Sequence, residues 1–383
     1  MAEEYVESRI SRFLHSKASK AGIPLSGTFE LTPCCNLSCR MCYVRKPMSE
    51  VQAEGGLVSA QKWIELGKAA RDAGMLYLLL TGGEPLSRHD FKEIYTALRN
   101  MGLVVSINTN GTLIDEDMVK FFAANPPAKI NMTLYGASRE TYGELCGLPE
   151  AYDKAVGAIK ALKAAGITVK LNCSVTNYNC MDMAKIHDIA DECKVHIQTA
   201  CYMFPPLRRD GTKIGENDRL SIEDDAYYTI QNEIRHMSTE EFLQRAEARI
   251  ARFSGTLDEQ ECLDAEGEHI GCRAGSTAFW VKWNGEMVPC GMLPIEGVNA
   301  FETGFADAWA ATRSGTADIR LPAKCKSCPD RPVCIMCAAS CYCETGAFDK
   351  TPEYLCRRTR ALIAETEKQF NRIKAEKEQE DES

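Results

Sequence analysis

The chain has 383 residues, enough for one large domain with a smaller one or for a single elaborated barrel. Hydrophobic residues make up 45% of it and charged residues 26%, as in an ordinary globular protein, and the net charge of −9 argues against a basic nucleic-acid-binding face. The acidic N-terminus is unlike a signal peptide, and the longest apolar run, 75–80, is too short to span a bilayer. We therefore expect a cytoplasmic protein that contacts neither nucleic acid nor membrane.

Strand-like and helix-like segments alternate from about residue 26 to residue 202. Ser59 is placed to cap a helix that ends at Gly74, and an apolar strand then runs into a glycine-rich turn. Repetition of this unit is typical of a parallel sheet or barrel, so we predict an α/β fold. The six expected strands are 28–32, 75–80, 103–108, 130–134, 168–175 and 195–201, and the later expected helices are 90–99, 115–123, 138–145, 152–165 and 181–192.

The rest of the chain divides by composition. Residues 215–261 look helical and charged, as in a connector. Residues 262–358 are rich in cysteine and poor in regular periodicity, as in a small domain held by metal. Residues 359–383 read as a charged helix with an acidic tail. With 1–25 as an N-terminal segment and 26–214 as the α/β unit, we expect five segments.

Nineteen cysteines are the most unusual part of the composition. A chain of this size buries a full core and needs no disulfides, whereas clustered C-x2-C spacings in an intracellular protein point to bound metal. Four cysteines lie between Cys34 and Cys42, and seven lie between Cys325 and Cys356. We therefore expect metal sites in two regions of the chain, in a reducing compartment.

Cys35, Cys39 and Cys42 form a C-x3-C-x2-C run just after the first expected strand. Three thiolates cannot complete a tetrahedral zinc site, and a [4Fe–4S] cluster normally takes four, so three leave one iron open for chemistry. Cys34 is a poor fourth ligand, because the side chains of adjacent residues in an extended segment point to opposite faces. The alternative is a zinc motif or an incomplete disulfide motif.

The run Gly82-Gly83-Glu84-Pro85 follows the second expected strand. Two glycines let the backbone approach a ligand closely and expose its N–H and C=O groups, and Glu84 adds a carboxylate for a positively charged group. As a bare tetrapeptide this run is a common turn. It comes about 40 residues after the cysteines and at the end of a strand, where parallel α/β folds place their working residues.

The cysteine run, with the aromatic Tyr43 directly after it, and the glycine turn together resemble the radical S-adenosylmethionine (SAM) superfamily. The resemblance implies a partial (β/α)6 TIM-like barrel with a [4Fe–4S] cluster held by the three catalytic cysteines. It implies that the open iron is chelated by the amine and carboxylate of SAM, and that Glu84 faces the SAM amine. The residues expected to bind SAM are Tyr43, Gly82, Gly83, Glu84, Asn110, Thr133 and Ser174.

The second group of cysteines resembles the SPASM extension of that superfamily, which carries two auxiliary [4Fe–4S] clusters. The pattern departs from the usual one, because two residues rather than three separate Cys334 from Cys337. The outer cluster would use Cys325, Cys328, Cys334 and Cys356. The inner one would use Cys272, Cys290 and Cys337, with Cys262, Cys341 or Cys343 as a fourth ligand, or with an open iron. The alternative is a zinc ribbon on Cys325, Cys328, Cys334 and Cys337, which leaves Cys272, Cys290 and Cys356 unused.

The resemblance implies that the protein cleaves SAM reductively to a 5′-deoxyadenosyl radical, which abstracts hydrogen from a substrate. SPASM enzymes most often act on peptides, so we expect a ribosomal-peptide maturase that installs a crosslink or an oxidised residue. The alternatives are an anaerobic sulfatase-maturing enzyme that makes formylglycine, a SPASM enzyme acting on a small molecule such as a porphyrin, and a non-catalytic iron–sulfur electron carrier. Residues 201–209, after the last strand, are expected to line the substrate channel.

The resemblance also implies partners and surroundings. About 25 residues before the first strand cannot encode the peptide-clamping domain with which many maturases begin. We therefore expect a peptide or protein substrate that is read directly or presented by a separate protein. A flavodoxin- or ferredoxin-type protein is the expected reductant. Because oxygen destroys exposed iron–sulfur clusters, we expect anaerobic surroundings.

Overall fold

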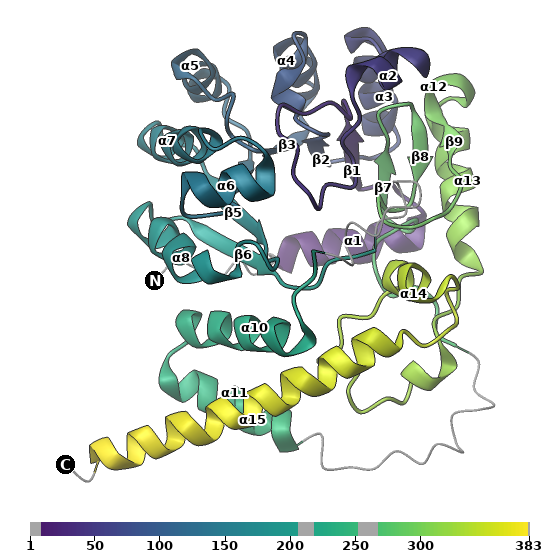
Figure 1. Cartoon of the computed structure of the whole chain (residues 1–383). Coiled ribbons are helices and arrows are strands. Elements are labelled where there is room, and N and C mark those ends of the chain that lie inside the picture. The colour runs from purple at the N-terminus through teal and green to yellow at the C-terminus, as the bar shows by residue number, and fades with distance from the viewer. Residues whose placement is uncertain (1–8, 206–217, 252–266, 382–383) are drawn as a thin grey trace.

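The computed structural model describes residues 9–205, 218–251 and 267–381. Its centre is a nine-stranded sheet, with helices on the outer side of the sheet (Figure 1). The strand order is β6-β5-β4-β3-β2-β1-β7-β8-β9. Six neighbouring parallel strands with helices outside them confirm the predicted α/β fold and partial barrel.

The six parallel strands lie within a few residues of the predicted ones. Alternate residues of β3, β4 and β5 are buried in the core, and the residues between them are largely polar. Two of these, Asn108 and Asn131, bond to each other across neighbouring strands at 2.8 Å. The strands are β1 (Ser26–Glu30), β2 (Tyr77–Thr81), β3 (Val104–Thr109), β4 (Lys129–Thr133), β5 (Val169–Ser174) and β6 (His196–Ala200).

Several helices of the barrel begin at side-chain caps. The side-chain oxygens of Ser59, Asp115 and Ser138 accept hydrogen bonds from the backbone N–H three residues later, at 3.5, 2.8 and 3.1 Å. The first two helices of the structure, α1 and α2, were not predicted. The helices of this part are α1 (Arg9–Ala21), α2 (Met48–Ala53), α3 (Ala60–Asp72), α4 (Phe91–Asn100), α5 (Glu116–Ala124), α6 (Arg139–Cys146), α7 (Ala151–Ala164) and α8 (Met183–Glu192).

Strands from the C-terminal part of the chain extend the sheet beyond β1. Ser26 of β1 pairs in parallel with Ala278 of β7, and β8 and β9 follow in antiparallel order. Phe29 of β1 and Phe279 of β7 are both buried, with ring centroids 6.4 Å apart, so this segment shares the core of the barrel. The sequence did not predict these strands. The elements are β7 (Ala278–Val281), β8 (Glu286–Val288), β9 (Val298–Asn299), α12 (Ala300–Thr303) and α13 (Phe305–Ala317).

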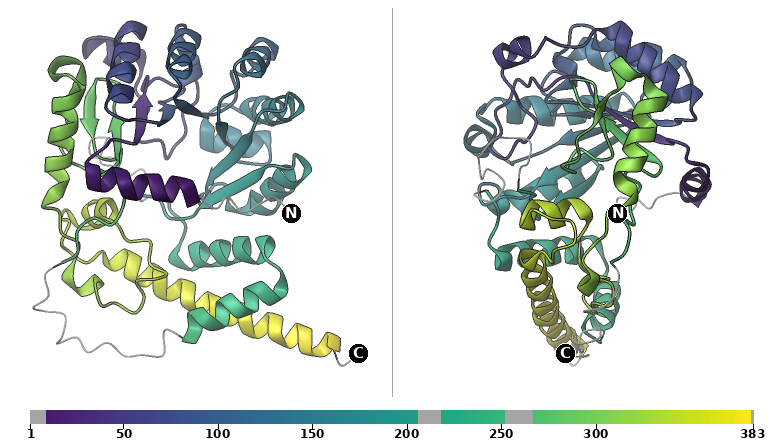
Figure 2. Two further views of the ribbon diagram at one scale, coloured as in Figure 1. Left: turned by 180° about the vertical axis from the view of Figure 1, so that it is seen from behind. Right: turned by 90° about the vertical axis from the view of Figure 1, so that its right-hand side faces the viewer.

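A layer of helices lies below the barrel in Figure 1 and is seen from behind and from the side in Figure 2. Two of these helices fall in the segment predicted to be a helical connector, and the long last helix packs against both. Asp225 and Arg358 join two of them through a buried ion pair of 2.6 Å. The elements are α10 (Ile222–His236), α11 (Thr239–Ala251), α14 (Ala338–Thr345) and α15 (Glu353–Asp381).

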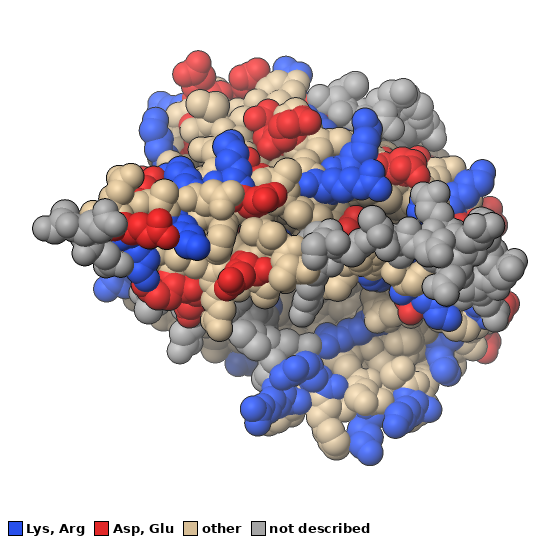
Figure 3. Space-filling model, turned by 90° about the horizontal axis from the view of Figure 1, so that it is seen from below, with Lys and Arg blue, Asp and Glu red and all other residues tan. Residues whose placement is uncertain are grey.

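The surface carries charges of both signs. On the face seen from below, acidic and basic side chains both occur, and basic ones gather along one edge (Figure 3). Among the residues that the structure describes, no helix has the length and apolarity needed to cross a bilayer.

Candidate active site

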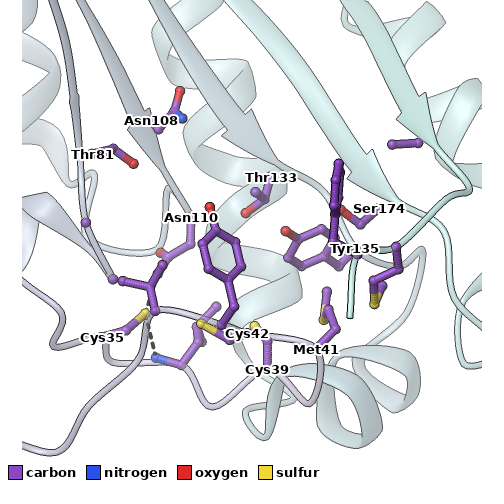
Figure 4. A pocket seen from close by; sticks show the side chains of 18 of the residues that line it. Cys35, Cys39, Met41, Cys42, Thr81, Asn108, Asn110, Thr133, Tyr135 and Ser174 are labelled. Carbon is purple, nitrogen blue, oxygen red and sulfur yellow. Dashed lines mark hydrogen bonds between the residues drawn. The ribbon is translucent and has the colours of Figure 1, made fainter. Parts of the chain in front are cut away.

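A cavity of about 460 Å³ lies at the carboxyl ends of the parallel strands. Because parallel strands end at the same edge of a sheet, residues far apart in the chain meet there. Thr81, Thr109, Thr133, Ser174 and Ala200 end or nearly end β2 to β6, and all five line the cavity. Figure 4 shows the strands running toward this space and the labelled side chains around it.

The three predicted cluster cysteines, Cys35, Cys39 and Cys42, line one side of the cavity (Figure 4). Their loop is held against the end of α6, because the backbone N–H of Ser38 donates to Cys146 O at 2.9 Å. Cys34, the neighbour rejected as a ligand, is not among the described residues that line the cavity. The structure therefore brings together the three thiols that the spacing singled out.

The environment of these thiols opposes their ionisation. Burial, with the charges of Glu84, Cys39 and Cys42, raises the pKa of Cys35 to about 12. A hydrogen bond with Cys146, together with burial, raises the pKa of Cys39 well above its usual value. Thiolates at these positions need nearby positive charge, which iron ions supply when thiolates ligate them. Three soft sulfur donors around one cavity fit an iron–sulfur cluster.

The glycine turn packs directly against the cysteine loop. Gly82 and Gly83 line the cavity, and the backbone N–H of Gly83 donates to Thr32 O at 2.6 Å. A Cβ on Gly83 would lie 2.6 Å from Pro33 O and would collide with Cys34 O. Glycine is therefore required at this position by the protein itself, because no side chain fits between the turn and the loop.

Glu84 is fully buried and is not among the described residues that line the cavity. Its Oε1 accepts hydrogen bonds from Leu86 N at 3.0 Å and Thr109 Oγ1 at 2.8 Å, and its Oε2 accepts one from Asn110 N at 2.7 Å. Burial raises the pKa of Glu84 to about 7, although these three bonds act in the opposite direction. The contact of Glu84 with the SAM amine stays a prediction. In the structure, the Glu84 carboxylate joins the turn after β2 to the end of β3 through these hydrogen bonds.

Asn110 connects that link to the cysteine loop. Its Nδ2 donates to Asn36 Oδ1 at 3.0 Å and lies 3.6 Å from Cys35 Sγ. Its Oδ1 accepts from Thr112 N at 2.9 Å, which fixes the amide orientation. The predicted SAM-binding residues that line the cavity are Tyr43, Gly82, Gly83, Asn110, Thr133 and Ser174.

The wall that completes the cavity is apolar and aromatic. It consists of Tyr202, Met203 and Phe204, directly after β6, together with Met292. The first three fall in the predicted channel segment, whereas residues 206–209 of that segment lie outside the described residues. Tyr135 also lines the cavity; it was not predicted as a site residue, although it lies two residues after Thr133, on the same face of an extended chain.

The C-terminal cysteines form two groups. Burial, together with the charges of Cys356, Cys328 and Cys334, raises the pKa of Cys325 to about 12, so the predicted outer set is close together. These four also line one small hollow of about 20 Å³. In the predicted inner set, burial raises the pKa of Cys290, and the charges of Cys337 and Cys272 add to the rise.

The possible fourth ligands of the inner set differ in their surroundings. Cys262 lies outside the described residues. Cys341 is completely buried, and burial, with the charges of Cys325 and Cys334 of the outer set and of Cys337 of the inner set, raises its pKa to about 12. Burial, Glu344 and the thiols of Cys337 and Cys290 raise the pKa of Cys343, also to about 12. In the described part of the chain, no three His, Cys, Asp or Glu side chains meet closely enough to share one metal ion.

Comparison with known proteins gives three findings. Residues 29–194 match the radical SAM superfamily. The chain is 27% identical to the AdoMet-dependent heme synthase of Methanosarcina barkeri (strain Fusaro), over 85% of this chain and 94% of that protein, and 31% identical to the Fe-coproporphyrin III synthase of the same organism, over 51% and 47%. Its fold is similar to that of anSMEcpe with bound AdoMet and a peptide, with a TM-score of 0.65 and 19% identity, over 91% of this chain and 98% of that chain.

Proposed function

We propose that the chain is a radical SAM enzyme, because residues 29–194 match that superfamily, and that it carries out a SAM-dependent radical reaction on a flat, largely apolar small molecule of the tetrapyrrole kind. The observation that carries the proposal is that two kinds of side chain line one cavity. We call the thiols and polar strand ends its polar side, and Tyr202, Met203, Phe204 and Met292 its apolar side.

The polar side is where SAM would bind. Cys35, Cys39 and Cys42 would hold a [4Fe–4S] cluster, and the backbone of Gly82 and Gly83 would lie against SAM, with Asn110, Thr133 and Ser174 nearby. When bound, the cluster and SAM would supply a 5′-deoxyadenosyl radical that takes a hydrogen atom from the substrate. The protein's own contribution is to orient these groups and to keep water from the space between them.

The apolar side supports a flat ring as the substrate. Tyr202, Phe204, Met203 and Met292 offer ring faces and polarisable sulfurs, which pack well against aromatic surfaces. The relative named AdoMet-dependent heme synthase aligns over most of both chains, which points in the same direction. This ranks the small-molecule alternative above the peptide that the sequence predicts first.

We also propose two auxiliary [4Fe–4S] clusters. The outer one would use the predicted four cysteines, since these line one hollow. For the inner one, the electrostatic neighbours of Cys343 favour it over Cys341 as the fourth ligand beside Cys272, Cys290 and Cys337. Met292 lies two residues after Cys290 and lines the cavity, so the inner set is next to the substrate side. A flavodoxin- or ferredoxin-type protein is the proposed reductant.

The test is an anaerobic assay of iron-loaded protein with SAM, dithionite and iron coproporphyrin III. We expect 5′-deoxyadenosine together with a change in the mass of the tetrapyrrole. The triple variant Cys35→Ala, Cys39→Ala, Cys42→Ala should lose both products and about a third of roughly twelve irons. Cys34→Ala is the matched control and should keep both. An unchanged tetrapyrrole in the presence of SAM cleavage would rule out this substrate.

A peptide or protein is the second candidate substrate, either read directly or presented by a separate protein. It is favoured by the likeness of the cysteine series from Cys272 to Cys356 to the SPASM extension, whose members mostly modify peptides. The same assay with short cysteine-containing peptides separates the two candidates, because only the true substrate should change mass in step with 5′-deoxyadenosine formation.

A further inference from the structure

A buried ion pair lies directly behind the apolar wall of the cavity. The side chains of Arg219 and Glu344 are 9% and 10% exposed, and Nη2 and Oε1 are 2.5 Å apart. Arg219 precedes α10 and Glu344 lies in α14, so the pair joins segments that are distant in the chain. Removing two charges from water is costly, and good geometry with further hydrogen bonds is needed to offset that cost.

Arg219 and Glu344 also form hydrogen bonds with residues of the apolar wall. Tyr202 Oη donates to Glu344 Oε1 at 2.7 Å, and Arg219 Nε donates to Met203 O at 2.8 Å. One member of the pair therefore holds a side chain of the wall, and the other holds its backbone. The guanidinium also lies 4.3 Å from the ring centroid of Tyr354 and 5.3 Å from that of Tyr202, so the cation lies close to two neighbouring aromatic rings.

The ion pair determines which part of the Tyr202 side chain faces the cavity. The hydroxyl is occupied by Glu344, and burial, together with that carboxylate, raises the pKa of Tyr202, so the phenol stays protonated as a donor. The ring packs edge-on against Phe204, with centroids 4.9 Å apart. The cavity is therefore lined here by aromatic surface, with the polar atom turned toward the ion pair.

We propose that Arg219 and Glu344 are positioning residues that hold Tyr202, Met203 and Phe204 in the arrangement that receives a flat, apolar ring of the substrate. The proposal rests on the function proposed above, because it assigns this wall to the substrate side of the cavity. It adds that the shape of the wall depends on α14, the helix that also carries Cys341 and Cys343.

The variant Glu344→Gln removes the charge and keeps the shape of the side chain. Its matched control is Glu233→Gln, because Glu233 forms a similar pair with Arg249, at 2.9 and 3.0 Å and with side chains 17% and 9% exposed. That pair joins α10 to α11, and neither residue lines the cavity in the described part of the chain. A second variant, Tyr202→Phe, removes one hydrogen bond and keeps the ring.

Three measurements on the full, iron-loaded chain test the proposal. Hydrogen–deuterium exchange of the backbone amides at 202–204 should become about tenfold faster in Glu344→Gln, because a charge-assisted hydrogen bond is lost. Hemin, used as the flat-ring probe and followed by its Soret absorbance, should bind about tenfold more weakly. The Kd for SAM should not change. Glu233→Gln should match the wild type in all three, and Tyr202→Phe should fall between the wild type and Glu344→Gln.

Each outcome decides a different point. Unchanged exchange at 202–204 would overturn the proposal, as would faster exchange with unchanged hemin affinity. If the wild type binds no hemin while exchange rises in Glu344→Gln, the proposed substrate class fails and the positioning role stands. If Glu344→Gln does not fold, the exchange and hemin affinity of folded Tyr202→Phe decide the same points by the same criteria.

Discussion

Glu84 has two candidate partners, the ligand and its own chain, and the structure shows the second. Its two carboxylate oxygens accept three hydrogen bonds from residues around the end of β3 and the turn after β2. Asn110, one of these donors, bonds in turn to Asn36 in the cysteine loop. A single buried carboxylate therefore sets the relative position of the three loops that surround the polar side of the cavity.

The raised pKa of Glu84 predicts a pH-dependent stability. Burial raises this pKa from 4.5 to about 7. The carboxyl therefore stabilises the folded chain most below pH 4.5, and that contribution is lost as the pH rises through 7, because ionisation is disfavoured in the folded state. Glu84→Gln does not titrate, so the thermal midpoint of the wild type relative to the variant should fall across this range. A difference that stays constant with pH would show that the pKa is not raised.

At the scale of elements, the turn after β2 and the loop after β1 act as one unit. We predict that Gly83→Ala displaces the cysteine loop, since a Cβ there meets backbone oxygens that cannot rotate away. Iron content and SAM cleavage should be lost while the circular dichroism of the helices is kept. Gly157→Ala is the control: its Cβ in α7 would meet nothing within 4 Å, so it should raise stability by about 1 kcal/mol. A fully loaded Gly83→Ala enzyme would contradict this packing.

Helix α14 carries two cysteines with different expected roles. Cys341 is completely buried against apolar neighbours, so Cys341→Ala should lower stability by about 1 kcal/mol and leave the iron content unchanged. Cys343→Ala should change the electron paramagnetic resonance of the proposed inner cluster or remove up to about four irons. The reverse pattern would assign Cys341 to the inner set.

The sequence predicts elements well where each carries its own signal. Strand β2 is an apolar run that ends at a glycine turn, β3 to β5 alternate buried residues with largely polar ones, and the predicted cysteine loop follows β1. The strands β7 to β9 are two to four residues long, too short for a periodicity, and β7 pairs with a strand some 250 residues earlier. The ion pair of Arg219 and Glu344 could not be predicted from the sequence either, because charged residues in helical segments normally indicate a solvated face.

At the scale of the whole molecule, the two sides of the cavity come from different parts of the chain, and their functions should be separable. Replacing Cys272 and Cys290 with Ala should leave SAM binding and uncoupled formation of 5′-deoxyadenosine, but abolish the change in substrate mass. Cys193→Ala, at the end of α8, is the control for loss of a thiol. Circular dichroism and the Kd for SAM must be measured on the same sample, since metal ligation contributes to folding. Full product formation by a folded double variant would remove the inner set from the substrate side.

The pairing of β1 with β7 has a consequence for how the enzyme is made. Until β7 leaves the ribosome, β1 is an open sheet edge, and the cysteine loop is attached to the end of that edge. At about 5–20 residues per second, the roughly 250 residues between them take on the order of tens of seconds to synthesise. Three thiols and an unpaired strand edge are therefore exposed together during translation, until β7 has been made.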